Sequence, residues 1–300
     1  RRNRDVVELK FLKLLHRVVH VGRRGCSDSV GRGESEVSLW ALIKHHLFRE
    51  CLRYFNLKDF FEISSIADIP SSGSGLGSSS SFTVGLINLL SIFQGKNLSK
   101  EAIAEIACEI EIEKCGSPIG KQDQYAASVG GLNKFIFNKD GTTEVKRIQC
   151  DLRYINKFDD WVIVFHTGGT RNANNILAAQ NKKMASLEKR NVVREMVSLC
   201  DPLIDFLQRG DIDSIGGILD QAWGLKKSIL DSISNPDIDR YYSKAKKAGA
   251  LGGKLLGAGQ HGFLMFCAPP CEHEKITNSL CELQKIDVNF DDEGTFNIKC

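Results

Sequence analysis

The chain has 300 residues, of which 42% are hydrophobic and 26% charged. This composition excludes a disordered chain, a collagen-like fibre and a small disulfide scaffold, and the length suits two ordinary domains or one large one. No uncharged apolar run reaches the roughly 18 residues that a membrane span requires, and a net charge of +3 is too small to indicate nucleic acid as a partner.

The first 24 residues contain eight Lys or Arg and two acids, with apolar residues at helical spacing. We interpret this stretch as a solvated helix, with a transit peptide or a membrane-surface helix as alternatives. Residues 22–36 are polar and glycine-rich, which indicates a loop. A helix is then predicted over Leu42–Phe55, and a strand over Phe60–Ile69 with Pro70 as its stop.

The middle of the chain predicts helices and strands in alternation. A helix is expected over Phe82–Phe93, and another from the N-cap Ser99 to about Lys114. The next predicted elements are a short helix at Tyr125–Val129, a strand at Leu132–Phe137, a hairpin turn at Asn138–Gly141 and a strand at Glu144–Ile148.

The second half predicts a buried strand, a helical region and a glycine loop between strand-like arms. The strand covers Trp161–Phe165, and the last predicted elements are one more helix and a final strand. The helices between them are expected at about Asn174–Leu187, Val192–Leu207, Ile212–Leu230 and Pro236–Ala248. The ten cysteines lack Cys-x-x-Cys and zinc-finger spacing, so we interpret them as reduced thiols of a cytosolic protein.

Residues 71–81, SSGSGLGSSSS, place alternating glycines and four serines at the start of an apolar helix. Glycines let the backbone approach a phosphate, free N–H groups at a helix start attract anions, and a serine hydroxyl can ligate Mg²⁺. A Walker loop does not fit because it requires a Lys, and a Rossmann fingerprint requires a different glycine spacing. A flexible linker is the alternative, but the flanking strand and helix favour a phosphate site.

Glu111 is a carboxylate at an unusual position of its predicted helix. Glu105, Glu109 and Glu113 recur every four residues and form a solvent face, whereas Glu111 falls on the flank of the apolar stripe. A carboxylate there is unfavourable unless it is paired or holds a metal. Spacing alone leaves three alternatives: a metal ligand, the partner of a Lys, and a carboxylate that reaches water.

Asp123 lies in a Pro/Gly loop just before the predicted short helix, two residues after Lys121. For a lone Asp, the common role in such a place is a helix N-cap. Together with the glycine-serine loop and Glu111, it completes the parts that phosphoryl transfer requires. These are a phosphate cradle, a metal ligand and a base for the attacking hydroxyl.

Four segments resemble motifs of the GHMP kinases, a superfamily that includes galactokinase, homoserine kinase and mevalonate kinase. PSSGSGLGSSSS at 70–81 is similar to their ATP-binding second motif, and GGKLLGAGQHGFLMF at 252–266 to their third motif. IGKQDQYAASVGGLN at 119–133 and TGGTRNANNIL at 167–177 resemble the D-glycero-D-manno-heptose 7-phosphate kinase branch. The similarity runs from about residue 45 to residue 298.

The resemblance implies an α+β fold of two domains. Residues 1–155 would form an ATP-binding domain like ribosomal protein S5 domain 2, with 1–41 atypical, and residues 156–300 a ferredoxin-like domain. It also implies ATP and Mg²⁺ as cofactors, a small-molecule sugar phosphate as the other substrate, and a cytoplasmic location. Neither nucleic acid nor a membrane is expected as a partner, and a homodimer is one candidate assembly.

The resemblance also implies roles for single residues. Asp123 would take the proton from the anomeric hydroxyl of heptose 7-phosphate, which becomes the 1,7-bisphosphate, and Ser79 and Glu111 would bind Mg²⁺. The residues expected at the ATP phosphates are Gly73, Gly75, Leu76, Gly77, Ser78, Ser79 and Ser80, with Gly257, Ala258 and Gly259 as a buttress. The residues expected at the sugar phosphate are Lys121, Gln122, Thr170 and Arg171.

Two departures from the family pattern set further expectations. The first motif, which binds the sugar, is not recognisable before residue 42, and GRRGCSDS at 22–29 is a faint echo of it. We therefore expect residues 1 to about 40 to make few long-range contacts, and the chain to bind ATP but to turn over heptose 7-phosphate weakly or not at all. Gln260 and His261 stand where the family has a glycine run. The alternatives are a kinase of another sugar, such as L-fucose, and a sensor that binds ATP or sugar without turnover.

Overall fold

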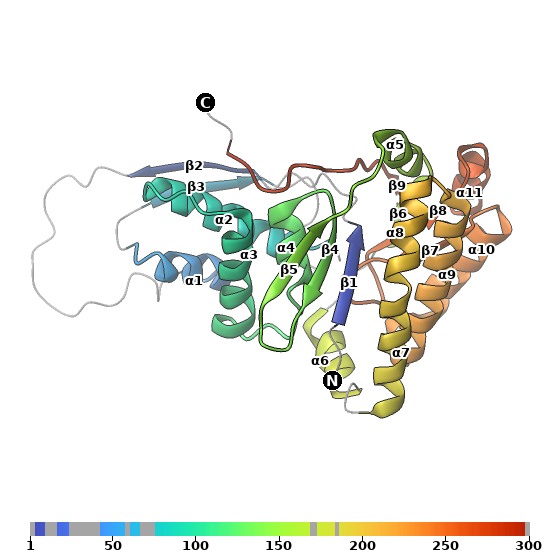
Figure 1. The fold of residues 1–300 in the computed structure, drawn as a ribbon, viewed down its shortest axis with the longest axis horizontal. Helices are drawn as coiled ribbons and strands as arrows, with labels where there is room; N and C mark the ends of the chain where they lie inside the picture. Colours follow the sequence, from blue (N-terminus) through green and yellow to red (C-terminus); the bar gives the residue numbers. More distant parts are fainter. Residues whose placement is uncertain are drawn as a thin grey trace, which may run out of the picture. The chain divides into compact units, whose positions relative to one another are not determined.

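The computed structural model describes residues 4–9, 17–23, 43–57, 61–66, 76–168, 173–183 and 186–297. They form two compact units, each assembled from separate stretches of the chain (Figure 1). One unit takes its described residues from 4–9, Leu76 and 131–292, and the other from 17–66, 77–130 and 293–297. Helices combined with antiparallel sheets confirm the predicted α+β class. A domain boundary at residue 155 stays a prediction.

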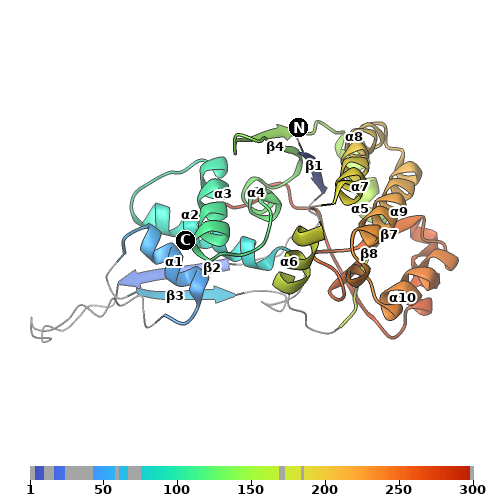
Figure 2. The same ribbon diagram turned by 90° about the horizontal axis from the view of Figure 1, so that it is seen from below.

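The unit that contains residues 77–130 is a helical cluster with a two-stranded antiparallel sheet. Strands β2 (Arg17–Arg23) and β3 (Phe61–Ile66) pair, and α2 packs on β2 (Figure 2). The helices are α1 (His46–Tyr54), α2 (Ser78–Phe93), α3 (Lys100–Cys108), a π-helical turn (Glu109–Lys114) and α4 (Gln122–Val129). Leu86 and Leu90 of α2 are fully buried in its core, as their spacing predicts.

The long helix predicted from Ser99 to Lys114 is confirmed, with one change of geometry. The Ser99 side chain caps α3, because its Oγ accepts a hydrogen bond of 3.1 Å from the Ala102 N–H. After Cys108 the chain winds more widely, and the Cys115 N–H bonds to the Ile110 carbonyl, five residues back, at 2.9 Å. Such π-helical turns are rare and occur often at functional sites.

The other unit holds two antiparallel sheets and most of the helices. One sheet has the order β1 (Arg4–Leu9), β4 (Leu132–Phe137), β5 (Thr143–Arg147). The second has the order β7 (Gly252–Leu255), β8 (Phe263–Cys267), β6 (Val162–His166), β9 (Gln284–Ile286). The helices are α5 (Leu152–Asp160), α6 (Ala173–Lys183), α7 (Leu187–Ser198), α8 (Cys200–Arg209), α9 (Ile212–Ile229), α10 (Pro236–Lys247) and α11 (His273–Ser279).

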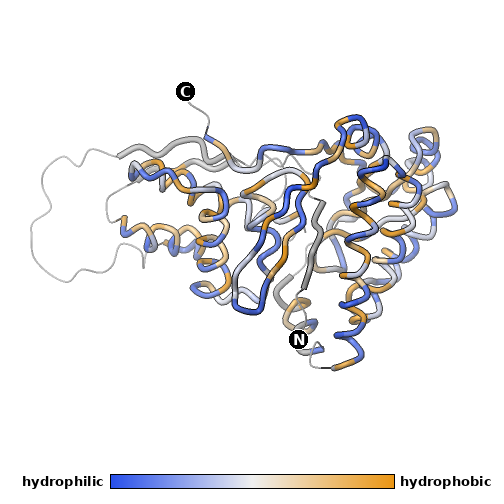
Figure 3. The backbone as a smooth tube through the Cα atoms, in the orientation of Figure 1, coloured by the Kyte–Doolittle hydropathy of each residue, from blue (hydrophilic) through white to orange (hydrophobic). Residues whose placement is uncertain are grey.

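Local sequence signals explain several of these elements. The predicted hairpin turn is confirmed: β4 and β5 pair in register, the Asn138 N–H bonds to the Thr142 carbonyl at 2.9 Å, and the tip is hydrophilic (Figure 3). Pro236 opens α10, where the missing N–H of a proline has no helical partner to lose. Trp223, Phe165 and Phe266 anchor a core between the four-stranded sheet and its helices.

The helix predicted in the first 24 residues is wrong. Arg4–Leu9 and Arg17–Arg23 are the strands β1 and β2. Strand β1 pairs with β4 through its whole length, from Arg4 opposite Phe137 to Leu9 opposite Leu132. The stabilisation from pairing with a strand distant in sequence exceeds the local preference for a helix that the spacing of the apolar residues indicates. The prediction of few long-range contacts is therefore wrong for these two strands, and residues 1–3, 10–16 and 24–42 lie outside the described part of the chain.

Two predicted helix boundaries are also wrong. The helix expected to reach Leu187 ends at Lys183, and the helix expected over Val192–Leu207 is two helices, α7 and α8, which meet at Leu199. Pro202 stands in the first turn of α8, and its missing N–H cannot continue the hydrogen-bond ladder of α7.

Three of the cysteines behave as the small apolar residues that the sequence predicts. Cys51, Cys108 and Cys267 are buried, and burial raises the pKa of Cys108 and of Cys267 to about 12. At neutral pH such thiols stay protonated and unreactive. Among the helices described here, none combines the length and the apolar character of a membrane span.

Candidate active site

The start of α2 has the features of an anion site. Gly77 is its N-cap, in the left-handed region at φ +68°, and no side chain caps the helix there. The first helical bond runs from the Ser81 N–H to the Gly77 carbonyl at 2.9 Å, so the N–H groups of Ser79 and Ser80 come before the first acceptor that the helix offers. No acid lies in the first turn. An anion placed here would meet N–H donors and the positive end of the helix dipole.

Asp123 lies directly against this helix start. A Cβ built on Gly77 would be 3.2 Å from Cγ of Asp123 and 3.4 Å from its Oδ2, so the carboxylate packs on the glycine backbone. Asp123 is not an N-cap: the N-cap of α4 is Lys121, and Asp123 is the second residue of the helix. The geometry thus places a carboxylate beside the predicted phosphate site, which the sequence spacing alone could not do.

Glu111 is buried, with only 1% of its surface exposed, and it accepts three hydrogen bonds. Ser79 Oγ donates to Oε1 at 2.6 Å, Ser80 Oγ donates to Oε2 at 2.7 Å, and Gln124 Nε2 also donates to Oε2. Two of these donors come from the first turn of α2 and the third comes from α4. Glu111 therefore ties the phosphate site to the helix of Asp123.

The burial of Glu111 eliminates two of the three alternatives that the spacing left open. The side chain does not reach water, and no Lys, Arg or His pairs with it within the described ranges. Its donors are all neutral, and a buried carboxylate without a cation is strongly unfavourable. Ser79 Oγ and Glu111 Oε1 are hard oxygen atoms 2.6 Å apart, and they suit Mg²⁺, which takes one or two protein ligands beside phosphate oxygens.

Glu111 lies in the π-helical turn and is buried more fully than its predicted place on the flank of the apolar stripe. Glu105 and Glu113 are exposed and Glu109 is half-buried, in line with the predicted solvent face. In the described part of the chain no three His, Cys, Asp or Glu side chains form a metal cluster.

The remaining predicted site residues fall into four groups, of which the last is the loop at 257–259. Lys121 and Gln122 are half-buried and open α4 next to Asp123. Leu76 and Ser78 are both buried. The predicted residues that lie outside the described ranges are Gly73, Gly75, Thr170 and Arg171.

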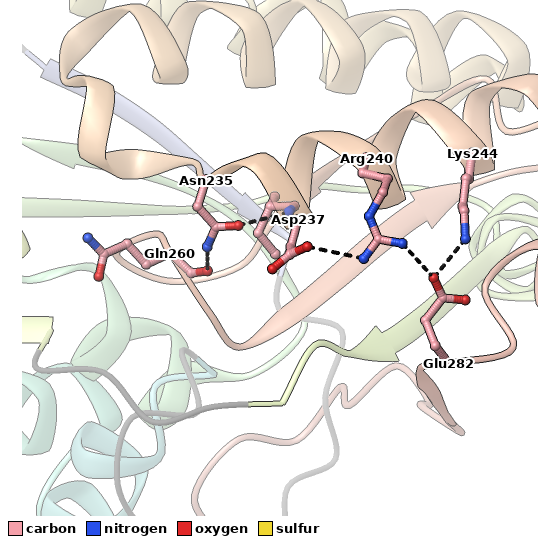
Figure 4. Close-up of polar contacts among 7 residues, drawn as sticks. Asn235, Asp237, Arg240, Lys244, Gln260 and Glu282 are labelled. Atoms are coloured by element: carbon pink, nitrogen blue, oxygen red, sulfur yellow. Dashed lines mark hydrogen bonds and ion pairs between the residues drawn. The ribbon is translucent and has the colours of Figure 1, made fainter.

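Gly257, Ala258 and Gly259 lie in the loop between β7 and β8, in the unit of the four-stranded sheet. Neighbouring segments hold this loop. Lys226 Nζ donates to the Gly257 carbonyl at 2.6 Å, and Asn235 Nδ2 donates to the Gln260 carbonyl at 2.7 Å (Figure 4). A Cβ at Gly259 would lie 2.6 Å from the Ile233 carbonyl oxygen, which is too close. Only glycine, which has no Cβ, therefore lets the loop backbone pack this closely against the backbone of Ile233. Gln260 adopts φ +64°, a left-handed conformation that glycine adopts more easily than glutamine. A glycine run is expected at this place from the family resemblance.

One residue of the site and one contact were not predicted from the sequence. Ser80 was expected at the phosphates, and its buried side chain bonds to Glu111. Gln124 was not singled out, whereas Gln122, two residues earlier, was. No sequence signal separates these glutamines, because only the fold shows that Gln124 is on the buried face of α4.

Comparison with known proteins identifies the family of the chain. Residues 41–131 match the GHMP kinases N terminal domain family, and residues 203–283 match the GHMP kinases C terminal family. A D-glycero-alpha-D-manno-heptose 7-phosphate kinase of Campylobacter jejuni is 30% identical over 246 residues, which cover 79% of this chain and 72% of that protein. A galactokinase of Pyrococcus furiosus is 29% identical over 63% of this chain and 59% of its own length.

A solved structure shows the same fold. The crystal structure of a D-glycero-D-manno-heptose 1-phosphate kinase from Bacteriodes thetaiotaomicron superposes with a TM-score of 0.65, covering 83% of this chain and 73% of that one at 24% identity. The two family matches include the serine-rich start of α2, the Glu111 turn, Asp123 and the loop between β7 and β8. On these grounds the chain belongs to the GHMP kinase family.

Proposed function

We propose that the chain is an ATP- and Mg²⁺-dependent sugar kinase that converts D-glycero-D-manno-heptose 7-phosphate to the 1,7-bisphosphate. GHMP kinases use ATP. The observation that carries the proposal is the Asp123 carboxylate against Gly77, at the uncapped start of α2 and beside the Ser79–Glu111 pair. The choice of heptose 7-phosphate is supported by the identity to the Campylobacter jejuni kinase.

Each residue has a separate task in the proposed reaction. The anomeric hydroxyl gives its proton to Asp123 while its oxygen bonds to the γ-phosphorus of ATP, and the bond from that phosphorus to the bridging oxygen breaks as ADP leaves. The N–H groups at the start of α2 hold the phosphates. Ser79 and Glu111 would hold Mg²⁺, which neutralises phosphate charge when bound.

A Glu111→Gln variant should need more Mg²⁺ to reach half its maximal rate, because a neutral amide is a poorer ligand for a hard cation. The measurement is the initial rate as a function of Mg²⁺ concentration at fixed ATP. Glu109→Gln is the matched control, since Glu109 lies in the same π-helical turn and pairs with Lys114 at the surface. Equal Mg²⁺ curves for the two variants would refute the metal-ligand role of Glu111.

An Arg171→Lys variant should raise KM for the sugar phosphate far more than KM for ATP. The reason is that a lysine replaces the planar fork of the guanidinium with a point charge. Steady-state kinetics with each substrate varied in turn would measure both constants. If an unphosphorylated sugar turned over equally well or better, the fucose-type alternative would be favoured instead. A bifunctional fucokinase/GDP-fucose pyrophosphorylase of Arabidopsis thaliana is 27% identical over 71% of this chain and 20% of that protein.

The proposal is tested by ADP release over a panel of sugars and sugar phosphates, combined with isothermal titration of ATP and of each sugar. Turnover of heptose 7-phosphate above the other compounds supports it. The unrecognised first motif predicts that this turnover is weak. Binding of ATP or sugar without any turnover would indicate the sensor alternative.

A further inference from the structure

Gln124 is a buried glutamine that donates one hydrogen bond and leaves its other polar atom unsatisfied. Its side chain is fully buried in α4, and Nε2 donates to Oε2 of Glu111. Its other polar atom, Oε1, is buried and has no hydrogen-bond partner among the described residues. An ionised carboxylate only accepts hydrogen bonds, so the amide must turn its nitrogen towards Glu111 and leave the oxygen unsatisfied. An unsatisfied buried oxygen is unfavourable, and an apolar side chain of the same size would avoid it.

The three donors divide the two oxygens of Glu111 into different roles. Oε2 accepts from both Ser80 and Gln124, and two hydrogen bonds occupy its two lone pairs. Oε1 accepts only from Ser79, at 2.6 Å, and keeps a lone pair for a cation. Oε2 is thus the anchored oxygen, and Oε1 is the one that can bind a metal.

We propose that Gln124 is a positioning residue that fixes the Glu111 carboxylate so that Oε1 is presented to the Mg²⁺ of the nucleotide. This inference rests on the proposed function, since it assumes that Glu111 holds the metal. In this proposal Gln124 acts through Glu111 and is not itself a ligand of the metal. Outer hydrogen-bond partners of this kind orient metal ligands, and their loss typically weakens metal affinity about 10–100-fold.

The test is a Mg²⁺ titration of the binding of a non-hydrolysable ATP analogue, followed by calorimetry. Gln124→Met keeps the size of the side chain and removes both polar atoms. We expect its half-saturating Mg²⁺ concentration to rise about 10-fold or more. The melting temperature without metal should change little, because the lost hydrogen bond and the removed unsatisfied oxygen offset each other. A lower melting temperature with an unchanged Mg²⁺ titration would mean a purely structural role and would overturn the proposal.

Two further variants keep the test decisive. Asn133→Leu removes another buried amide, whose Nδ2 donates to the Gly131 carbonyl, and it should leave the Mg²⁺ titration unchanged. Ser80→Ala removes the second donor to Oε2 and should shift the titration in the same direction as Gln124→Met. It therefore tests the anchoring of Oε2 even if Gln124→Met does not fold. An unshifted titration for Ser80→Ala would then count against the anchoring of Oε2.

Glu111→Gln in the same titration separates this inference from the proposed function. If Glu111→Gln shifts the Mg²⁺ requirement and Gln124→Met does not, only the role of Gln124 is overturned. If Glu111→Gln causes no shift, Glu111 is not a metal ligand, and both the metal site and the role of Gln124 are overturned. Neither reading depends on the identity of the sugar, because no sugar is present.

Discussion

An Asp123→Asn variant is expected to lose turnover by about 100-fold or more, the range for the loss of a general base. Asparagine has nearly the same shape, so it fits against Gly77 as the carboxylate does, but its amide cannot take the proton of the sugar hydroxyl. Binding of Mg-ATP should stay close to that of the parent chain. ADP release at saturating substrates and calorimetric titration with ATP measure the two quantities.

The control must separate lost catalysis from a weakened helix. Asp213 is the second residue of α9, as Asp123 is of α4, and its side chain is exposed in the unit of the four-stranded sheet. Both carboxylates stabilise their helix, because each lies near the positive N-terminal end of the helix dipole. Asp213→Asn should therefore show a small loss of stability and normal turnover. Turnover of Asp123→Asn within a few-fold of the parent would exclude Asp123 as the base.

Much of the site could be predicted from the sequence, because its parts have local signals. Glycines and serines at a helix start indicate an anion site whatever surrounds them. Glu111 was identified by its angle on one helix, and this needed no tertiary knowledge. What the residues alone could not show is that Asp123 meets Gly77 and that Glu111 meets Ser79. Those contacts join three helices, and before the fold was known only the family resemblance linked them.

The features that could not be predicted depend on distant partners. Residues 4–9 have helical spacing but form a strand, because β4, more than a hundred residues later, offers a full antiparallel edge. The sequence pattern does not predict the π-helical turn, since the residues around Glu111 are equally compatible with an ordinary α-helix. Gln124 could not be told from Gln122 for the same reason: only the packing of α4 decides which glutamine is buried.

A Gly77→Ala variant is expected to lose about 10-fold or more in turnover, although the substitution adds only a single methyl group. The new Cβ would lie 3.2 Å from Cγ of Asp123, closer than such atoms usually approach, so the carboxylate must shift by a few tenths of an ångström. Positioning supplies much of the rate in phosphoryl transfer, and since a misplacement of about 1 Å can cost 100-fold, this smaller shift should cost less. ADP-release kinetics would measure the loss.

Gly95 offers a matched control in the same unit. It follows α2 at φ +72°, close to the φ +68° of Gly77, and a Cβ there would meet nothing within 4 Å. Alanine at either position must adopt the left-handed conformation, which costs about 1–2 kcal/mol, so both variants should lose similar unfolding free energy. Only Gly77→Ala should also lose turnover. If the two variants lost equal stability and kept equal turnover, the contact between Gly77 and Asp123 would have no part in catalysis.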